Sequence, residues 1–197
     1  MARSELWLTG DTDADELLAS EPLALLIGMV LDQQIPMERA FKAPLDLKER
    51  LGGTLDAASI AAMPSDDLVT VFAEKPALHR FPRSMAGRVQ DVCAAVVDTY
   101  GGEASAIWTT ASDGKELLAH VKALPGFGDQ KARIFIALLG KQVGVRPPGW
   151  DEAAGAYGES GSFRSVADID SPEALAKVRQ FKQQMKARAR AKLPNAG

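Results

Sequence analysis

The sequence predicts a mostly α-helical protein, and three observations lead to that prediction. Apolar residues recur at helical spacing through most of the chain, with short breakers of Gly, Pro and polar residues between them. Alternating segments of strand length are absent after residues 6–8, which look extended. The 197 residues are 46% hydrophobic and 25% charged, a balance that excludes disordered and multi-spanning membrane proteins. We therefore expect one helical domain, or two small subdomains that share a core.

The first helices are marked by their termini. Residues 13–18 begin with acidic side chains, which suit a helix N-terminus. Pro22 suits a first turn, and the apolar residues 23–31 then predict a buried helix. Its polar end, residues 32–34, follows directly, and Pro36 is expected to stop it.

Three further helices are expected before residue 102. Residues 55–63 and 65–72 have helical patterns, and the second begins with acidic residues. Residues 85–100 carry valines and Cys93 at i, i+3, i+4, i+7 and i+8, and Gly101–Gly102 ends this helix.

The C-terminal half contains a helical hairpin and a long loop. Helices are expected at 115–123 and 129–141, joined by Leu124–Pro125–Gly126–Phe127–Gly128. Residues 142–165 contain two prolines and five glycines, so most of this segment is expected to be irregular, and such long loops are often functional. A last helix is expected at 171–190, capped by Ser171.

The cysteine count and the apolar runs indicate the cellular compartment in which the protein is expected. Cys93 is the single cysteine, so neither an intrachain disulfide nor a four-thiolate metal site can form. The longest apolar run, residues 23–31, is too short to span a bilayer, and no signal pattern stands at the N-terminus. We expect a cytoplasmic protein that does not bind membranes.

Charge is distributed unevenly along the chain. Residues 1–100 contain 9 Lys and Arg and 16 Asp and Glu, whereas residues 101–197 contain 14 and 10. The segment Ala174–Gly197 carries seven basic side chains and no acid. A polyanion could dock there, or the segment could be a solvated helix with a basic tail. Its basic residues are Lys177, Arg179, Lys182, Lys186, Arg188, Arg190 and Lys192.

The hairpin turn has the chemistry of a phosphate site. Gly126 and Gly128 flank one apolar residue, so no side chain separates their amides from a ligand at the start of the next helix. The helix dipole contributes roughly 0.3–1 kcal/mol, and Lys131 or Arg133 could add a charged contact. The alternative is a plain helical hairpin whose glycines only cap and pack.

Four segments resemble one protein family. Leu124–Ala132 resembles the helix-hairpin-helix motif of the HhH-GPD superfamily of base excision DNA repair glycosylases. Leu23–Ala40 resembles the family's first buried helix with its Gln-containing loop, and Ser84–Val97 resembles its central amphipathic helix. The stretch Gln142–Asp151 falls where the catalytic loop follows the hairpin, so the resemblance covers residues 22–151.

The resemblance implies a mostly α, two-lobed fold with a cleft between the lobes. One lobe would contain residues 22–143, including the hairpin at 115–141, and the other residues 1–21 and 144–197. Such a protein, expected as a monomer, would grip double-stranded DNA through the hairpin and flip an altered nucleotide into the cleft. Gln33 or Gln34 would probe the gap in the duplex, unless they only cap the buried helix. A monovalent cation is implied at three backbone carbonyls, those of Lys122, Leu124 and Phe127.

Two departures from the family pattern restrict the chemistry. Gln130 stands where strand-cutting members place an amine, and Lys131 projects about 100° away around the helix. No lyase step is therefore expected. The cysteines that hold an iron–sulfur cluster in some relatives are also absent, so no such cluster is expected.

The catalytic acid implied by the resemblance is Asp151, 25 residues after Gly126. Glu152 competes for this role, and either carboxylate could instead cap a helix. Asp129 is a further departure, because its charge would repel a phosphate at the hairpin.

Two other side chains have open roles. Trp150 could stack on an extruded base, at roughly 1–3 kcal/mol, or belong to the core. His79 and Arg80 or Arg83 could reach a phosphate, but a position on the solvated surface is expected.

The leading hypothesis is a monofunctional DNA glycosylase that hydrolyses the N-glycosidic bond of a damaged or mispaired base, a hydrolase of base excision repair. The alternatives are a non-catalytic helix-hairpin-helix DNA-binding protein and a helical interaction domain that binds no nucleic acid. The lesion depends on a pocket assembled from distant helices, which the sequence does not identify.

Overall fold

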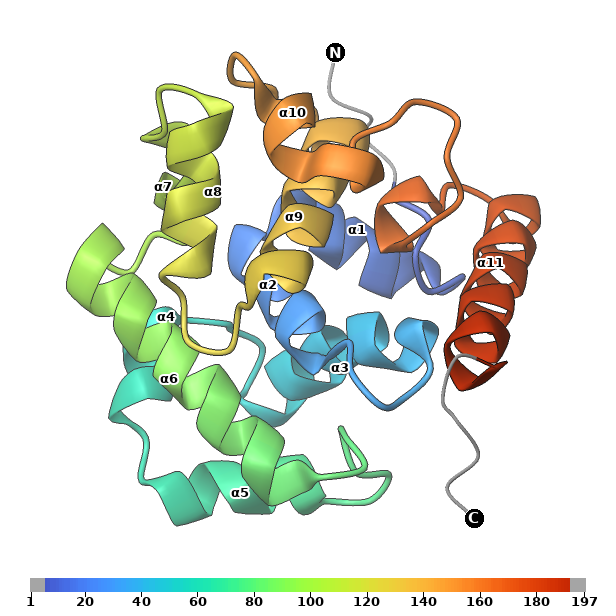
Figure 1. Ribbon diagram of the computed structural model, residues 1–197. Coiled ribbons are helices and arrows are strands. Elements are labelled where there is room, and N and C mark those ends of the chain that lie inside the picture. Colours follow the sequence, from blue (N-terminus) through green and yellow to red (C-terminus); the bar gives the residue numbers. More distant parts are fainter. Residues whose placement is uncertain (1–5, 192–197) are drawn as a thin grey trace, which may run out of the picture.

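The computed structural model describes residues 6–191 and is helical throughout, with no strand in that range (Figure 1), which confirms the mostly α prediction. Two 3₁₀ turns, Gly155–Tyr157 and Val166–Asp168, and a π turn, Leu139–Val143, accompany the helices. Across residues 6–191 no helix combines the length and apolarity needed to cross a bilayer. The helices are α1 Thr12–Ser20, α2 Pro22–Leu31, α3 Met37–Arg50, α4 Ala57–Ala62, α5 Ser65–Ala73, α6 Pro82–Tyr100, α7 Ala106–Thr109, α8 Gly114–Lys122, α9 Asp129–Leu138, α10 Trp150–Ala154 and α11 Pro172–Ala191.

Helix α2 lies in the middle of the molecule (Figure 1) and is buried from Leu23 to Leu31. It packs against α1, α3 and α6. Pro22 occupies its first turn, where a missing amide costs no hydrogen bond. Asp32 ends the helix, and its amide donates to the carbonyl of Gly28 at 3.0 Å. The apolar run therefore becomes a central helix whose polar end emerges beside the other elements.

The sequence does not predict α3 or the short α7. Pro36 stands at the N-cap of α3, so it begins a helix where only a stop was expected. A second proline, Pro44, lies buried inside α3. Around these helices, α6 packs against α4 and α5 in one group, and α10 packs against α8 and α9 in another. The division into lobes at residues 22 and 143 stays a prediction.

Most of residues 142–165 is irregular, as expected, and two glycines admit the short helix α10 within this segment. A Cβ on Gly114 would lie 2.2 Å from the carbonyl oxygen of Gly149, and one on Gly140 would lie 2.2 Å from the ring of Trp150. Only bare backbone at both positions lets the start of α10 approach. Gly114 begins α8 and Gly140 follows α9, so α10 starts at the end of the hairpin helices opposite their turn.

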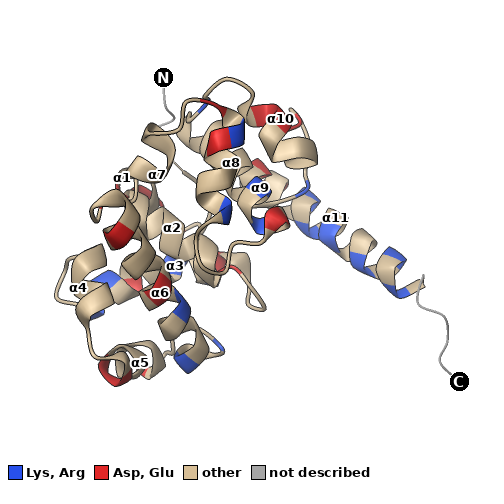
Figure 2. Ribbon diagram, turned by 60° about the vertical axis from the view of Figure 1, so that its left-hand side comes forward, with Lys and Arg blue, Asp and Glu red and all other residues tan. Residues whose placement is uncertain are grey.

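Helix α11 extends away from the rest of the molecule (Figure 2). Ala174 and Val178 are its only buried residues. Lys192, the last basic residue of the segment Ala174–Gly197, lies outside the described residues.

Candidate functional site

The hairpin turn between α8 and α9 presents open backbone. Leu124 and Phe127 are buried and anchor the turn, whereas Gly126 and Gly128 are exposed. Gly126 has a φ of +80°, a conformation that glycine adopts without strain. A Cβ on either glycine would meet nothing within 4 Å. The turn is therefore held from beneath by apolar side chains, and its outer face is free.

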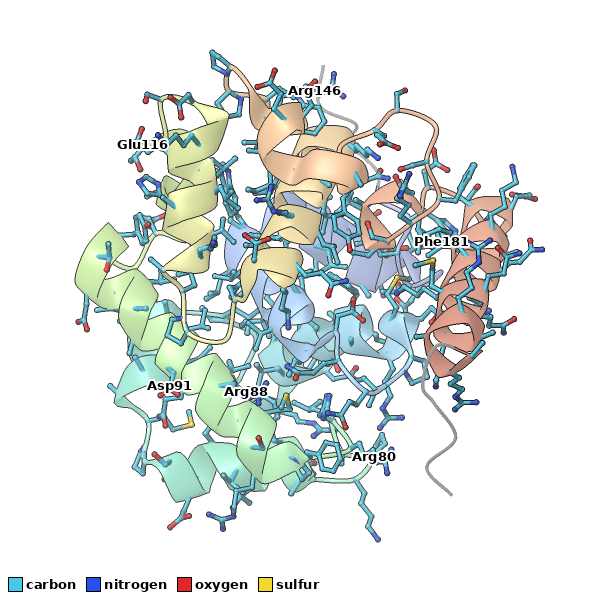
Figure 3. All side chains as sticks on the ribbon, viewed as in Figure 1. Arg80, Arg88, Asp91, Glu116, Arg146 and Phe181 are labelled. Carbon is cyan, nitrogen blue, oxygen red and sulfur yellow. The ribbon has the colours of Figure 1, made fainter. Side chains whose placement is uncertain are left out.

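A shallow groove of about 600 Å³ runs along this turn. It is lined by residues 124–128 and Lys122, together with Arg88 and Asp91, which Figure 3 shows on α6. Cations at a concave surface with free amides suit a phosphate group. The sequence did not point to Arg88, since a single Arg on an amphipathic helix carries no distinctive pattern.

The charge of Asp129 is compensated inside the protein. Its carboxylate lies 3.0 Å from Nζ of Lys122 and 2.8 Å from Nε of Arg133. These partners hold the pKa of Asp129 below its ordinary value, with the Arg133 hydrogen bond as the largest cause. Arg133 also donates to the carbonyl of Ala153 at 2.7 Å, which ties α9 to α10. Arg133 thus serves contacts within the protein, and the expected repulsion by Asp129 is reduced.

The loop after α2 is fastened by Gln33. Its Nε2 donates to the carbonyl of Val30 at 2.8 Å, and its Oε1 accepts from Arg88 at 2.7 Å. Nε2 of His79 lies 2.9 Å from the Gln33 carbonyl, while Nδ1 of His79 accepts from the Phe81 amide at 3.0 Å. Arg88 therefore connects the hairpin groove to this loop.

The expectation that His79 lies on the solvated surface is wrong, since only 1% of this residue is exposed. Burial lowers the pKa of the imidazole, and the hydrogen bond to the Gln33 carbonyl opposes this. A neutral His79 with its proton on Nε2 satisfies both contacts. Its sequence neighbours mix apolar Leu78 and Phe81 with charged Arg80, a pattern that does not reveal its burial.

Gln34 is the exposed member of the pair of glutamines. Its φ is +58°, the one positive value at a non-glycine residue among those described. A long side chain in this region costs about 1–2 kcal/mol. Within residues 6–191 no hydrogen bond holds its side chain. The fastened Gln33 thus presents a free Gln34 in a strained backbone conformation, and such strain clusters at functional sites.

Lys131 links the hairpin to the end of α2. Its Nζ donates to the carbonyl of Val30 at 3.1 Å and lies 5.6 Å from the centre of the Phe127 ring. Burial lowers the pKa of Lys131 to about 8, and Asp32 opposes that shift. The amine is half-buried, so its contacts favour a role in positioning the turn.

A pocket of about 350 Å³ opens beside the hairpin helix. The end of α2, the start of α9, residues 156–166 and α11 surround it. Figure 3 shows Phe181 on the side of α11 that faces the rest of the molecule. Gln130, the residue at the family's amine position, lines the pocket and donates to the Tyr157 hydroxyl at 2.9 Å. The lining residues are Asp32, Gln130, Ile134, Ala156, Tyr157, Arg164, Ser165, Val166, Phe181, Lys182 and Met185.

Asp32 is the carboxylate among these lining residues. Burial raises the pKa of Asp32, while the charges of Lys182 and Lys131 lower it by a smaller amount. Asp151 and Glu152 are exposed in the first turn of α10 and do not line the pocket. The structure therefore brings Asp32, not Asp151, together with Gln130.

Trp150 packs within the protein rather than at the hairpin. Its ring lies against Gly140 and carries the Arg146 guanidinium 5.7 Å from its centre. It contributes to a second depression, away from Gln130. Cys93 is buried in the core, and burial raises the pKa of its thiol to about 12. Neither residue is placed to meet a ligand at the hairpin.

The three carbonyls expected to hold a cation lie around the hairpin turn. Within residues 6–191 no backbone amide donates to the carbonyls of Lys122 or Phe127, while that of Leu124 accepts from the Phe127 amide at 3.2 Å. A carbonyl oxygen has two lone pairs, so all three retain acceptor capacity. Among all the described residues, 6–191, there is no group of three or more His, Cys, Asp or Glu side chains suited to a metal ion.

A family model described as HhH-GPD superfamily base excision DNA repair protein matches residues 27–193. No curated protein and no solved structure matches the chain.

Proposed function

This chain belongs to the HhH-GPD superfamily of base excision DNA repair proteins, and we propose that it is a monofunctional DNA glycosylase. The observation that carries the proposal is the position of the 350 Å³ pocket, which holds Asp32 and Gln130 beside the exposed glycine turn. A pocket of this size suits one small flat molecule such as a nucleobase.

The hairpin and the loop after α2 divide the handling of DNA between them. The amides of Gly126 and Gly128 bind a backbone phosphate, assisted by the charges of Arg88 and Lys122. Gln34, with free amide groups on a fastened loop, fills the gap that a flipped nucleotide leaves. The carbonyls of Lys122, Leu124 and Phe127 would hold a monovalent cation, which would add positive charge to the phosphate site.

Asp32 is the acidic catalyst in this proposal. As the N-glycosidic bond breaks, positive charge develops on the sugar, and a carboxylate beside it stabilises that charge. Water then forms the new bond to C1′ and its proton leaves to solvent, while the base departs with the electron pair of the broken bond. Gln130 has no amine that could form an imine, so the product is an abasic site and the strand stays intact.

The test uses duplexes that each carry one altered or mispaired base. The wild-type protein should release at least one such base, and strand cleavage should appear only after alkaline treatment. Asp32→Asn should lower the rate by about 100-fold or more, whereas Asp151→Asn should retain it. If Asp151→Asn lost activity and Asp32→Asn kept it, Asp151 would be the catalytic acid, as the sequence analysis expects.

The second candidate is a non-catalytic DNA-binding protein, favoured by the position of Asp151 outside the pocket. It predicts salt-dependent duplex binding without release of any base in the panel. Borohydride trapping of a protein–DNA adduct would contradict the proposed monofunctional reaction, because it requires an imine.

A further inference from the structure

Helix α11 is strongly basic and weakly anchored. From Pro172 to Ala191 it carries six Lys or Arg residues and a single acid, Glu173. Each of residues 182–191 is exposed, and this part of the helix extends away from the rest of the molecule (Figure 2). Within the described residues no carboxylate pairs with Lys186 or Arg190. Like charges spaced along a helix repel one another, so this segment would gain stability from an external polyanion.

Four of the six cations lie on one side of the helix. At about 100° per residue, Arg179, Lys182, Lys186 and Arg190 fall within an arc of about 80°, and we call them the α11 stripe. Lys177 and Arg188 lie on the other side of the buried residues, and Lys177 stands 4.4 Å from the centre of the Phe163 ring.

Two contacts fix the direction in which the α11 stripe faces. Arg179 pairs with Glu38 at the start of α3, and Lys182 lines the pocket that holds Asp32. Asp32 and Glu38 bracket the loop that carries the exposed Gln34. The α11 stripe therefore faces the same loop that the proposed function places against DNA.

The hairpin groove by itself offers limited positive charge. Asp91 lines it, and Lys122 is paired with Asp129. The α11 stripe runs about 16 Å from Arg179 to Arg190 at about 1.5 Å per residue. That length matches four to five nucleotide steps of about 3.4 Å each along a duplex.

We propose that the α11 stripe is a second contact for the DNA backbone, on the far side of the pocket from the hairpin. This inference rests on the proposed function, since it assumes that the nucleotide enters the pocket from a bound duplex. The hairpin and the α11 stripe then hold phosphates on both sides of the pocket mouth, and Lys186 and Arg190 contact the strand beyond the flipped nucleotide.

The test compares two double variants of the full chain. Lys186→Gln with Arg190→Gln removes two charges from the α11 stripe, and Lys177→Gln with Arg188→Gln removes two from the other side of the same helix. Fluorescence anisotropy with a duplex that carries an abasic-site analogue gives the binding constant at several salt concentrations. The slope of log K against log salt should weaken by about 1.8 in the first variant, at about 0.9 per phosphate, and by less than about 0.5 in the control.

The outcomes separate this inference from the function on which it rests. An equally weakened salt slope in both variants would show a general charge effect and overturn the proposal that the α11 stripe contacts DNA. Unchanged slopes in both, with a wild-type protein that binds duplex, would also overturn it. A wild-type protein without salt-dependent duplex binding would refute DNA binding itself, and with it the stripe.

Discussion

Replacement of Asp32 by Asn should stabilise the fold while it removes the proposed activity. Asp32 stands at the C-terminal end of α2, where the helix dipole disfavours a negative charge by about 0.3–1 kcal/mol. Burial adds a further penalty, and Lys182 and Lys131 offset part of it. We expect the unfolding free energy to rise by about 1 kcal/mol at pH 7, or by about 2–4 °C in Tm.

The pH dependence of this gain follows from the raised pKa of Asp32. The folded protein holds the Asp32 proton to a higher pH than the unfolded chain, so stability falls as pH rises through that window. The difference between Asp32→Asn and wild type should therefore be absent below the unfolded value of about 3.9. It should grow as pH rises and then stay constant.

Urea unfolding of both proteins between pH 4 and 8 measures this difference. Asp151→Asn is the matched control with the opposite sign, because Asp151 lies in the first turn of α10, where a negative charge is favourable. It should lose a few tenths of a kcal/mol. If Asp32→Asn lost more than about 1 kcal/mol at pH 7, Asp32 would be a structural cap, and the reasoning for a pocket carboxylate would be refuted.

Three other changes test the surrounding architecture. The unfolding free energy of the wild type should fall as pH drops below about 6.5, since burial lowers the pKa of His79. His79→Gln, which can still donate to the Gln33 carbonyl, should flatten this pH profile. An unaltered profile would show that other groups cause the pH dependence. Gly140→Ala should cost about 1–3 kcal/mol in urea unfolding, because its Cβ would meet the Trp150 ring at 2.2 Å; a loss under about 0.5 kcal/mol would show that the ring moves aside. Gln34→Gly should raise stability by about 0.5 kcal/mol through relief of the positive φ, net of the unfolded-chain entropy, and should slow base release; unchanged release would remove Gln34 from the proposed mechanism.

Local patterns were enough to predict most helices. The apolar run of α2, its Pro22 start and the glycine turn of the hairpin each depend on residues within a few positions of one another. The exposure of Gly126 and Gly128 also followed from that turn, because glycines at a tight connection between helices stay on the surface. Helix α3 was missed because a proline was interpreted as a stop where it serves as an N-cap.

The sequence by itself determined the helical class, the hairpin and the absence of an amine at Gln130, because each depends only on residues that are close together in the chain. Only the tertiary structure decided which acid lines the pocket with Gln130. Gly114 and Gly140 leave room for the start of α10, so Asp151 lies at the end of the hairpin helices opposite their turn. The close packing of α2 against its neighbours delivers Asp32 to the pocket instead. Such a placement depends on contacts between segments far apart in the chain, which no local pattern records.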